Sequence, residues 1–533
     1  MSDHFYITTP IYYPNGEPHL GHVYTTLCAD VLAQYHRLMG TPTYFLTGTD
    51  EHGVKMVKTA DEKGTTPQAL ADLNAGIFEA LWKELKVTND DFIRTSSNRH
   101  KAGATKIVEQ MLATGDIYLG AYEGWYDEGQ EEFVTENNAK EAEYKSVISG
   151  RPLVRYSEPT YFFKLSKYVP QVLAAIEADQ IKIRPEIRKN EVVSKLKQGV
   201  EDLSISRASL TWGIPLPNDP KHVLYVWIDA LSNYVTALGY ASVEGEGVRR
   251  EGNAPHALRL NPQPSLFSTF WPASVHLIGK EIMWFHTVYW PAMLMSLNQP
   301  LPSVVFAHGW WTAEGRKMSK SLGNFIDLDR LRGVIEMYSL DTLRYYLLRS
   351  APFGNDLDWK DAEVASAYAE LGNVVGNLLN RTLNMIGKYR DGRIPPAGAL
   401  SEADDVLVKP WTVFGGQLEA AYENLELQRA ALLPIELARA ANTYIDQTAP
   451  FKLAKDPAKA AELDKVLNLI AQACKKVLIG LLPILPEKAA AGLAQLNVDL
   501  QGKTLSDLLG SDLPEGHQLG QPQVLFPRIE PKA

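Results

Sequence analysis

The chain has 533 residues, 45% of them hydrophobic, and a formal net charge of −10 at pH 7. This length and apolar content exclude a disordered protein and predict three or four domains with separate cores. The acidic balance excludes bulk attraction to nucleic acid, so an RNA partner must be met by local basic surfaces.

The sequence also bears on location and on the cysteines. The N-terminus, Met1-Ser2-Asp3-His4, has no basic segment followed by an apolar one. The longest apolar run, Val477–Leu485, is interrupted by Pro483 and is too short to cross a bilayer, so we expect a cytoplasmic protein. Cys28 and Cys474 fall in apolar helical patterns, which favours core positions over a disulfide.

The first segment, to about Asp116, alternates strands and helices. His4–Thr9 predicts a buried strand, and apolar residues at helical spacing then run from Leu20 to a stop at Gly40. Tyr44–Leu46 predicts a second buried strand. This alternation is typical of a doubly wound, Rossmann-type parallel sheet of the α/β class, whose ligands lie at the carboxyl ends of the strands.

The character of the chain changes in residues 117–224, where aromatic residues and glycines predict an inserted lobe with short strands. The sheet is expected to resume with Leu224–Ile228 and to continue through Val275–Gly279. The residues between about 243 and 266 are rich in Gly, Pro and Arg, which predicts a surface loop.

The second half of the chain is predicted to be mostly helical to about Leu493. Long helices that suit a bundle are expected at Gly376–Tyr389, at Asp464–Leu481, and at Glu419–Asn442 with a kink at Pro434. The tail, Gln523–Ile529, predicts a short apolar strand that packs back on the body.

Two histidines open the first predicted helix. In His19-Leu20-Gly21-His22 the histidines are three residues apart, so they share one face at the positive end of the helix dipole, where N–H groups favour an anion. Gly21 removes the side chain that would keep a nucleotide base away from the backbone. The motif predicts a nucleotide site, and its alternative is a pair of surface histidines at a helix start.

A basic pentapeptide, Lys317-Met318-Ser319-Lys320-Ser321, lies between Gly315 and Gly323 in a stretch poor in large apolar residues. Such a stretch predicts a mobile loop. A cationic loop between glycine hinges can close on phosphates as charge shifts onto a leaving pyrophosphate, which stabilises the transition state. As an isolated string it would be a solvated basic turn.

Together the two motifs resemble those of class I aminoacyl-tRNA synthetases. Four further segments resemble the methionyl-tRNA synthetase family, namely Thr9–Gly16, Thr47–Gly53, Tyr225–Ala230 and His308–Trp311. The resemblance runs from about residue 4 to the end of the chain. It implies a ligase that activates L-methionine with ATP, accompanied by Mg²⁺, and transfers it to the 3′ end of tRNA(Met), both initiator and elongator.

The resemblance also implies a domain plan. The catalytic domain would occupy residues 1–116 and 225–310, with a connective domain inserted at 117–224. The lysine loop and a stem-contact region would occupy residues 311–365. A helical bundle that binds the anticodon would follow at 366–533, with a C-terminal tail.

By resemblance, the residues that bind ATP are His19, Gly21, His22, Gly279, Lys317, Ser319 and Lys320, of which the histidines and lysines act in catalysis. The methionine pocket would consist of Ile11, Tyr13, Asp50, Trp227, Ala230, Tyr234, Ile282 and His286. A substrate ammonium needs a carboxylate, which Asp50 supplies, and a thioether packs well against aromatic rings. Asp50 has an alternative role as the cap of the next helix.

The same resemblance assigns an anticodon site. Asn377 and Arg381 are four residues apart and share a helical face, and Phe451 follows a proline. These residue types read loop bases by edge hydrogen bonds and by stacking, although the family commonly has tryptophan where Phe451 stands. Alternatively, the first two are polar bundle-surface residues and Phe451 is core. Other basic candidates are Arg330, Arg332, Arg344, Arg349, Lys388 and Arg390.

Two departures from the family pattern matter. Many relatives fold the lobe around zinc with Cys-x-x-Cys pairs, but Asp127 and Gln130 stand at the first pair and no second pair follows. Structural zinc wants four thiolate or imidazole ligands, so we expect none. The chain also lacks the extra C-terminal tRNA-binding module that makes some relatives dimers, which predicts a monomer.

Three other functions compete with the leading one. A class I synthetase for leucine, valine or isoleucine would carry a larger insertion that houses an editing site. A tRNA-binding paralogue without catalysis would not need His19, His22, Asp50, Lys317 and Lys320. A nucleotidyltransferase that adenylates a small metabolite would have no use for the helical domain. Amino-acid-dependent ATP–pyrophosphate exchange separates these functions.

Overall fold

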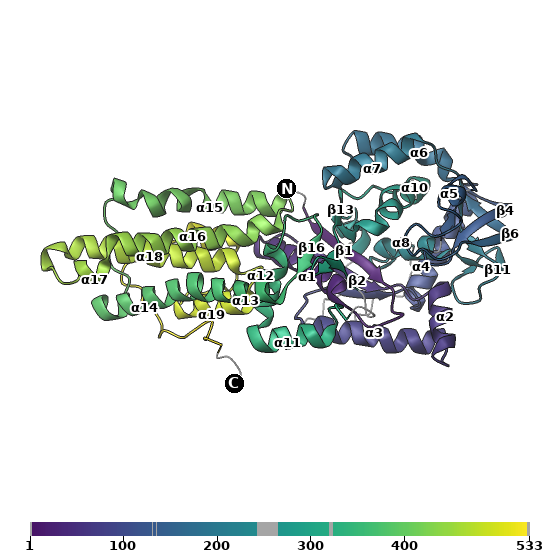
Figure 1. Cartoon of the computed structure of the whole chain (residues 1–533). Coiled ribbons are helices and arrows are strands. Elements are labelled where there is room, and N and C mark those ends of the chain that lie inside the picture. The colour runs from purple at the N-terminus through teal and green to yellow at the C-terminus, as the bar shows by residue number, and fades with distance from the viewer. Residues whose placement is uncertain (1–2, 131, 135, 242–264, 319–322, 530–533) are drawn as a thin grey trace. The chain divides into compact units, whose positions relative to one another are not determined.

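The computed structural model describes residues 3–130, 132–134, 136–241, 265–318 and 323–529. The chain divides into two compact units (Figure 1). Met1–Ala33 and Pro42–His308 form the first, which we call the sheet unit, and Gln34–Thr41 and Gly309–Ala533 form the second, the helical unit. The predicted class, an α/β fold followed by a helical domain, is confirmed.

The sheet unit is built on six parallel strands in the order β3-β2-β1-β12-β13-β7. Their bounds are β1 Phe5–Tyr12, β2 Thr43–Thr49, β3 Asp91–Arg94, β7 Lys182–Arg184, β12 Val275–Gly279 and β13 Val304–His308. The strand order reverses between β1 and β12. A crevice for ligands is therefore expected at the carboxyl ends of these two strands.

Helices cover both faces of this sheet, which is why its strands are nearly continuous apolar runs. In Figure 1, α3 is drawn below β1 and β2, and α6, α7 and α10 are drawn above them. The helices of the sheet unit are α1 Leu20–Leu38, α2 Val54–Glu62, α3 Pro67–Glu84, α4 Asn98–Ala113, α6 Leu165–Glu177, α7 Glu186–Lys197, α8 Val226–Thr236, α9 Leu266–Phe270 and α10 Trp290–Ser296. The last residues of α1 fall in the helical unit.

Gly48 fixes the close approach of β2 to β3. A Cβ at Gly48 would lie 2.0 Å from the carbonyl oxygen of Ile93, so a larger residue would force the two strands apart. Asp50 follows β2 directly. The glycine therefore helps to set the position of the backbone at Asp50.

The predicted strand Leu224–Ile228 is wrong. The strand β11 ends at Leu224 and pairs with β9 and β10 in a small antiparallel sheet, and the helix α8 begins at Val226. Every residue of α8 is buried. A helix buried on all sides shows the same unbroken apolar run as a buried strand, so the pattern cannot separate them.

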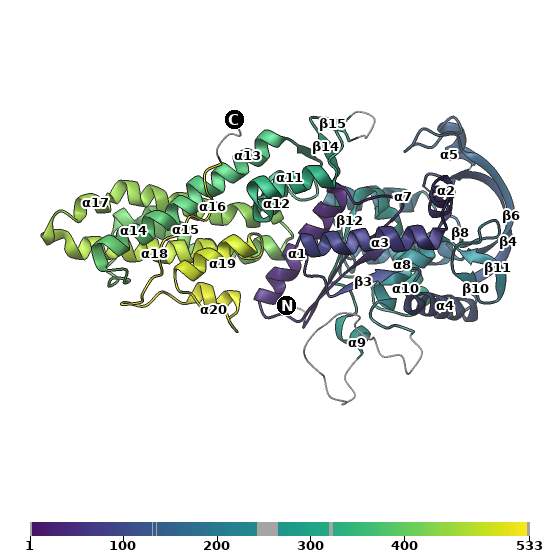
Figure 2. The same cartoon turned by 90° about the horizontal axis from the view of Figure 1, so that it is seen from below.

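The inserted segment forms a second sheet of antiparallel strands in the order β5-β4-β6-β8. Figure 2 shows β4 and β6 as a long curved ribbon. Its elements are β4 Ile117–Asp127, β5 Glu132–Val134, α5 Glu136–Glu141, β6 Val154–Phe163 and β8 Leu203–Ser204, followed by β9 Ser206–Arg207, β10 Pro215–Leu216 and β11 Asp219–Leu224. One strand of this segment, β7, belongs to the main sheet. Of the predicted surface loop, residues 243–264 lie outside the described residues.

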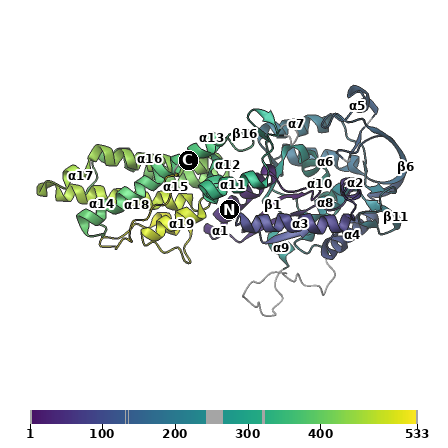
Figure 3. The same ribbon diagram turned by 60° about the horizontal axis from the view of Figure 1, so that its bottom comes forward.

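The helical unit begins with a small sheet in the order β15-β14-β16 and continues as a bundle (Figure 3). Its strands are β14 Trp311–Ala313, β15 Arg316–Lys317 and β16 Leu357–Trp359. Its helices are α11 Leu328–Tyr338, α12 Leu340–Arg349, α13 Asp361–Glu370, α14 Asn377–Arg390, α15 Asp405–Glu423, α16 Leu427–Thr448, α17 Pro450–Leu453, α18 Ala460–Leu481, α19 Pro486–Gln495 and α20 Leu505–Gly510. A π-helical segment, η4 Leu371–Gly376, leads into α14.

Two predictions in this unit need correction. The helix expected at Glu419–Asn442 is broken, because α15 ends at Glu423 and Leu425 adopts a φ of 59° before α16 starts. No glycine or proline marks this turn, so the spacing of apolar residues predicted one continuous helix across it. The tail forms no strand within its described residues, yet Leu525 and Phe526 are buried as expected.

Other expectations about the interior are confirmed. Cys28 and Cys474 are both buried free thiols. Among the described residues no helix is long and apolar enough to cross a membrane.

Candidate active site

The predicted nucleotide and methionine residues of the sheet unit gather at one edge of the main sheet. Ile11 and Tyr13 stand at the end of β1, Asp50 follows β2, and Gly279 ends β12. Ile282 lies in the turn η1 Lys280–Ile282, and His286 lies in the π-helical turn η2 Phe285–Tyr289. At this edge the strand order predicts a crevice, and π-helical turns are frequent at functional sites.

His19 and His22 stack at the start of α1, with ring centroids 3.9 Å apart. The backbone N–H of His19 donates to Nδ1 of His22, and the N–H of Gly21 donates to Nδ1 of His19, both at 3.1 Å. A ring nitrogen that accepts a hydrogen bond carries no proton, so each neutral ring carries its proton on Nε2. The predicted helix start is confirmed, and the two rings offer a pair of N–H donors.

His22 is neutral at physiological pH. Its ring packs on Phe78 and Tyr12, and burial followed by the nearby His19 lowers the pKa of His22 well below its ordinary value. A Cβ at Gly21 would lie 3.0 Å from Cε1 of His19, so a larger residue would press on that ring. The positive end of α1 therefore attracts an anion through N–H groups and not through an imidazolium.

Asp50 is a buried carboxylate, 3% exposed, whose backbone N–H donates to the carbonyl of Tyr12 at 2.9 Å. It does not cap the next helix, since the N-cap of α2 is Gly53. Burial raises the pKa of the Tyr234 hydroxyl, and the neighbouring Tyr12 and Asp50 raise it further. The charge of Asp50 therefore acts on Tyr234, a residue of the predicted methionine pocket.

The rest of that pocket is apolar and aromatic. Trp227 stacks on Phe285 with centroids 3.7 Å apart, and Ile11, Tyr13 and Ile282 pack against the core cluster that contains Trp227 and Tyr234. Trp227, Ala230 and Tyr234 recur at helical spacing on α8. The structure therefore brings these predicted residues together.

His286 and Tyr234, two polar residues of the predicted pocket, are hydrogen-bonded to each other. Burial lowers the pKa of His286 to about 4, so its ring is neutral. The Nδ1–H donates to the carbonyl of Ile282 at 2.9 Å, which leaves Nε2 to accept from the Tyr234 hydroxyl at 2.7 Å. The one hydroxyl proton of Tyr234 is thus committed to His286.

The lysine motif begins in the helical unit. Lys317 is exposed and ends β15, which a turn at Glu314–Gly315 joins to β14. Gly315 has a φ of 72° and donates its N–H to Asp358, and the Asn324 amide donates to the Lys317 carbonyl at 3.2 Å. Ser319 and Lys320 lie outside the described residues.

The predicted anticodon residues belong to the helical unit. Asn377 is exposed at the start of α14, and Phe451 is 48% exposed in α17, so Phe451 is not core. Arg381 forms an ion pair of 2.7 Å with Asp446 of α16. Figures 1, 2 and 3 all show α17 at one end of the bundle, just beyond the end of α16.

One basic candidate for RNA contact is wrong. Arg344 is 1% exposed and donates to the carbonyls of Ile484 and Pro483, beyond the end of α18. A buried guanidinium that satisfies carbonyls in this way serves the fold.

Asp127 and Gln130 stand at the first zinc-binding pair of many relatives. The described residues hold no cluster of side chains that could bind a metal ion. Oδ1 of Asp127 accepts from the N–H groups of Gly129 and Gln130 at 2.8 and 3.2 Å. Ser146 closes a similar turn, since its Oγ accepts from the N–H groups of Ile148 and Ser149 at 3.3 and 3.1 Å. Hydrogen bonds thus shape both turns.

Sequence reasoning gave no role to His52, Asp229 and His100, which form a buried network beside the predicted pocket. One signal for it was present. Asp229 interrupts the apolar run of α8, and a charge in a buried run requires partners.

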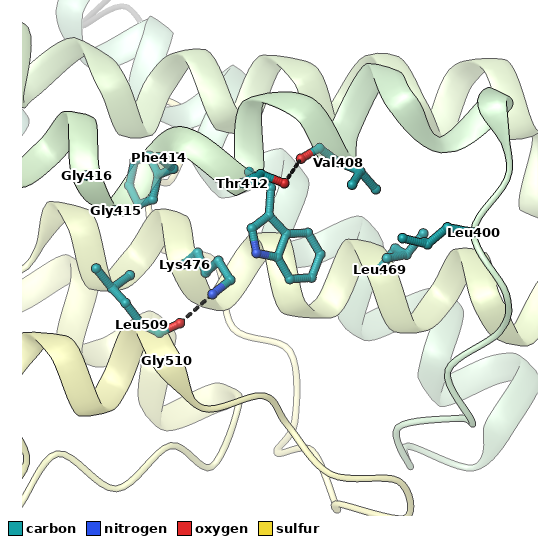
Figure 4. A pocket seen from close by; sticks show the side chains of 11 residues that line it. Leu400, Val408, Thr412, Phe414, Gly415, Gly416, Leu469, Lys476, Leu509 and Gly510 are labelled. Carbon is teal, nitrogen blue, oxygen red and sulfur yellow. Dashed lines mark hydrogen bonds between the residues drawn. The ribbon is translucent and has the colours of Figure 1, made fainter.

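A cavity of about 510 Å³ lies in the helical unit between α15, α18 and α20 (Figure 4). No predicted site residue lines it. Nζ of Lys476 lies 5.2 Å from the ring centre of Trp411 and donates to the carbonyl of Leu509. Lys476 therefore satisfies a terminal carbonyl of α20, a common role of lysine at a helix C-terminus.

Comparison with known proteins agrees with this geometry. Residues 5–142 and 138–383 match the family described as tRNA synthetases class I (M), and residues 394–533 match the anticodon binding domain of methionyl tRNA ligase. The chain is 44% identical over 541 aligned positions to the methionine–tRNA ligase of Bacillus subtilis (strain 168), covering 99% of this chain and 78% of that protein. The corresponding protein of Enterococcus faecalis is 42% identical, with 99% and 77% covered.

Two solved structures are also similar. Mycobacterium tuberculosis methionyl-tRNA synthetase in complex with methionyl-adenylate matches with a TM-score of 0.89 at 36% identity, over 98% of this chain and 99% of that chain. Its apo form matches with a TM-score of 0.83 at 34% identity, over 99% and 98%.

Proposed function

The chain belongs to the class I methionyl-tRNA synthetase family, and we propose that the residues at the carboxyl edge of its main sheet bind methionine and ATP for the activation of methionine. The chain is a methionine–tRNA ligase that uses ATP. The observation that carries the residue assignment is the buried aromatic cluster that contains Trp227, Phe285 and Tyr234, together with the buried carboxylate of Asp50, whose charge acts on the Tyr234 hydroxyl.

Asp50 is the proposed partner of the methionine ammonium. A carboxylate held in a buried site interacts with an ammonium more strongly than it would in water. The thioether would occupy the slot formed by Ile11, Tyr13, Trp227, Ala230, Tyr234, Ile282 and His286. Rings and a polarisable sulfur attract each other, which favours methionine over a purely aliphatic side chain of similar size.

We propose that the phosphates of ATP bind at the start of α1. His19 and His22 would each donate a hydrogen bond from Nε2, and Gly21 and Gly279 would leave room for the nucleotide to approach the backbone. Lys317, Ser319 and Lys320 are assigned to the phosphates by the motif alone. Mg²⁺ would enter bound to ATP, where it neutralises charge on the phosphates.

The reaction needs no covalent nucleophile on the protein. The methionine carboxylate attacks the α-phosphorus, and the bond from that phosphorus to the bridging oxygen breaks, which releases pyrophosphate. A ribose hydroxyl of the tRNA then attacks the methionyl carbonyl and AMP leaves. Positioning and charge stabilisation supply most of the catalysis in phosphoryl transfer.

The helical unit is proposed to read the anticodon through Asn377, Arg381 and Phe451. Asn377 and Phe451 are exposed, as groups that meet bases must be. Edge hydrogen bonds and stacking are the usual means of reading single-stranded loops. We also propose a cytoplasmic location, because tRNA charging supplies translation there. That the protein is a monomer stays a prediction, which sedimentation tests.

ATP–pyrophosphate exchange, run against all twenty amino acids, tests the assignment. We expect exchange with methionine and little with the others. Exchange with leucine, valine or isoleucine as the best substrate would replace the assignment with another synthetase. No exchange with any amino acid, together with tRNA binding, would indicate a paralogue without catalysis.

A further inference from the structure

Asp229 is a fully buried charge in the first turn of α8, between the predicted pocket residues Trp227 and Ala230. Burial alone would raise its pKa. The charge interaction with His52 and the hydrogen bonds from His100 and His52 lower the pKa of Asp229 to about 2 instead. Such a carboxylate is ionised at every physiological pH, so it needs both partners in place.

The two histidines reach Asp229 from different parts of the chain. Nδ1 of His52 lies 2.5 Å from Oδ2, and Nε2 of His100 lies 2.7 Å from Oδ1. His100 belongs to α4, and its Nδ1 lies 2.8 Å from the Thr236 hydroxyl at the end of α8. Both carboxylate oxygens are therefore satisfied by imidazole N–H groups.

Close packing of α4 on α8 makes the His100 contact possible. Gly103 lies one turn after His100, and a Cβ there would be 2.6 Å from Cγ2 of Thr236. The His100 side therefore anchors Asp229 to a rigid helix pair. The His52 side has a different consequence, because His52 is two residues from Asp50.

The segment that carries Asp50 is held on its other side as well. The Glu51 carboxylate pairs with Arg94, whose Nε lies 2.6 Å from Oε1. The Glu51 N–H donates to the Thr95 hydroxyl at 2.9 Å, and its carbonyl accepts from the Trp212 indole at 2.6 Å. The His52 contact ties this segment directly to α8.

We propose, resting on the proposed function, that Asp229 is a positioning residue which, through His52, sets the separation between the Asp50 carboxylate and the side-chain slot on α8. An amino acid must reach both at once, with its ammonium at Asp50 and its side chain in the slot. A fixed separation therefore measures side-chain length. The His52–Asp229 pair contributes to the selection of methionine without touching it.

Variants at His52 test this inference in the full-length enzyme. His52→Asn keeps an N–H donor near the position of Nδ1, whereas His52→Gln moves the donor to the position of Nε2, away from Asp229. Both are polar and similar in size. We expect the glutamine variant to raise the KM for methionine in pyrophosphate exchange about tenfold, as a small misplacement of a substrate contact does. The asparagine variant should stay within about threefold of wild type, and the KM for ATP should not change in either.

Discrimination gives the second readout, which a merely structural role would not move. Ethionine is one methylene longer than methionine. In the glutamine variant the ratio of kcat/KM for methionine to that for ethionine should fall, because a loosened separation tolerates the longer side chain. His100→Gln keeps an N–H donor at the position of Nε2 and is the matched control. Its ratio of kcat/KM for methionine to that for ethionine should equal the wild-type ratio.

The outcomes are separable. Equal KM values and equal discrimination in His52→Asn and His52→Gln, both with cooperative thermal melts, would overturn the inference. If either variant does not fold, Asp229→Asn replaces it, and there an unchanged ratio of methionine to ethionine overturns the inference. Wild-type enzyme without methionine-dependent exchange would instead refute the proposed function on which the inference rests.

Discussion

The two proposed recognition sites are built in opposite ways. In the sheet unit, Asp50 is 3% exposed and stands in a segment whose neighbours are hydrogen-bonded on both sides. In the helical unit, Phe451 is 48% exposed and Arg381 is held by one ion pair with Asp446. The first site is a network of buried partners, and the second is a set of groups on a surface.

Ligand size explains the difference. Methionine offers one ammonium, one carboxylate and a short side chain, so a protein must surround it with fixed groups in a dry site to select it. Anticodon bases are large, arrive from solvent, and are recognised on their edges and faces. A change in the first site should therefore disturb activation, whereas a change in the second should disturb tRNA charging alone.

The largest effect is expected from a change at Lys320. This residue belongs by sequence to the helical unit, which contains Gly309–Ala533, so the change tests whether methionine activation depends on the sheet unit alone. Lys320→Ala removes the charge that the motif assigns to the leaving pyrophosphate, and we expect the barrier to exchange to rise by roughly 2.7–4 kcal/mol. The KM for methionine should be nearly intact. Lys409→Ala, an exposed lysine of α15, is the control, and an unchanged rate in Lys320→Ala removes the loop from catalysis.

Asp50→Asn should cost about 1.5–3 kcal/mol, the worth of a charge-assisted hydrogen bond to the substrate ammonium. The loss should show as a higher KM for methionine and a lower rate, with ATP binding scarcely altered. Asp61→Asn, on the exposed side of α2, controls for a general loss of negative charge. If methionine saturates both variants at the wild-type concentration, Asp50 does not bind the ammonium.

Arg381→Ala should weaken aminoacylation by about 1–3 kcal/mol, the cost of one lost base contact. Methionine activation without tRNA should be unchanged. Arg429→Ala removes another ion pair of α16, that with Glu436, and reports the cost of loosening the bundle. Equal losses in the two variants, or a loss in activation as well, would mean that Arg381 only stabilises the bundle.

Phe451→Leu should have a smaller effect of about 0.5–1.5 kcal/mol on charging, because leucine keeps apolar bulk and loses the aromatic face. Phe451→Trp should recover or exceed wild-type charging, since a larger ring stacks over more area. The apparent KM for tRNA measures both. A leucine variant that charges tRNA like wild type would show that no base stacks on this ring.

The smallest effect is expected from metal removal. With Asp127 and Ser146 closing their turns by hydrogen bonds, elemental analysis of purified protein should show no stoichiometric zinc. Chelators should leave thermal unfolding of the sheet unit unchanged. Zinc at one ion per chain would refute this prediction.

Regular patterns made most of the architecture predictable. The strands around residues 4–9, 44–46 and 275–279 and the helix after His19 follow from short apolar runs and from helical spacing. The helix α8 did not follow, because it is buried on every side and opens with an apolar run, Val226–Ile228, that also suits a buried strand. The turn at Leu425 was missed for a related reason, since no glycine or proline marks it.

The candidate site was predictable only in part. Motifs supplied the histidines of α1 and the carboxylate of Asp50, because their chemistry is local to a few residues. The network of His52, His100 and Asp229 joins segments 129 and 177 residues apart, and no local pattern reports such a pairing. Contacts of this kind follow from the packing of α4 on α8, which sequence spacing does not encode.

The two buried thiols have a consequence for redox chemistry. Cys28 and Cys474, which are the whole cysteine content of the chain, are each 1% exposed, and burial raises the pKa of Cys474 to about 12. Oxidants and alkylating agents attack thiolates, so neither sulfur is open to them in the folded protein. At the first turn of the lobe, Asp127 stands where many relatives carry a zinc thiolate, and a carboxylate does not oxidise. Peroxide stress should therefore leave charging by this enzyme intact.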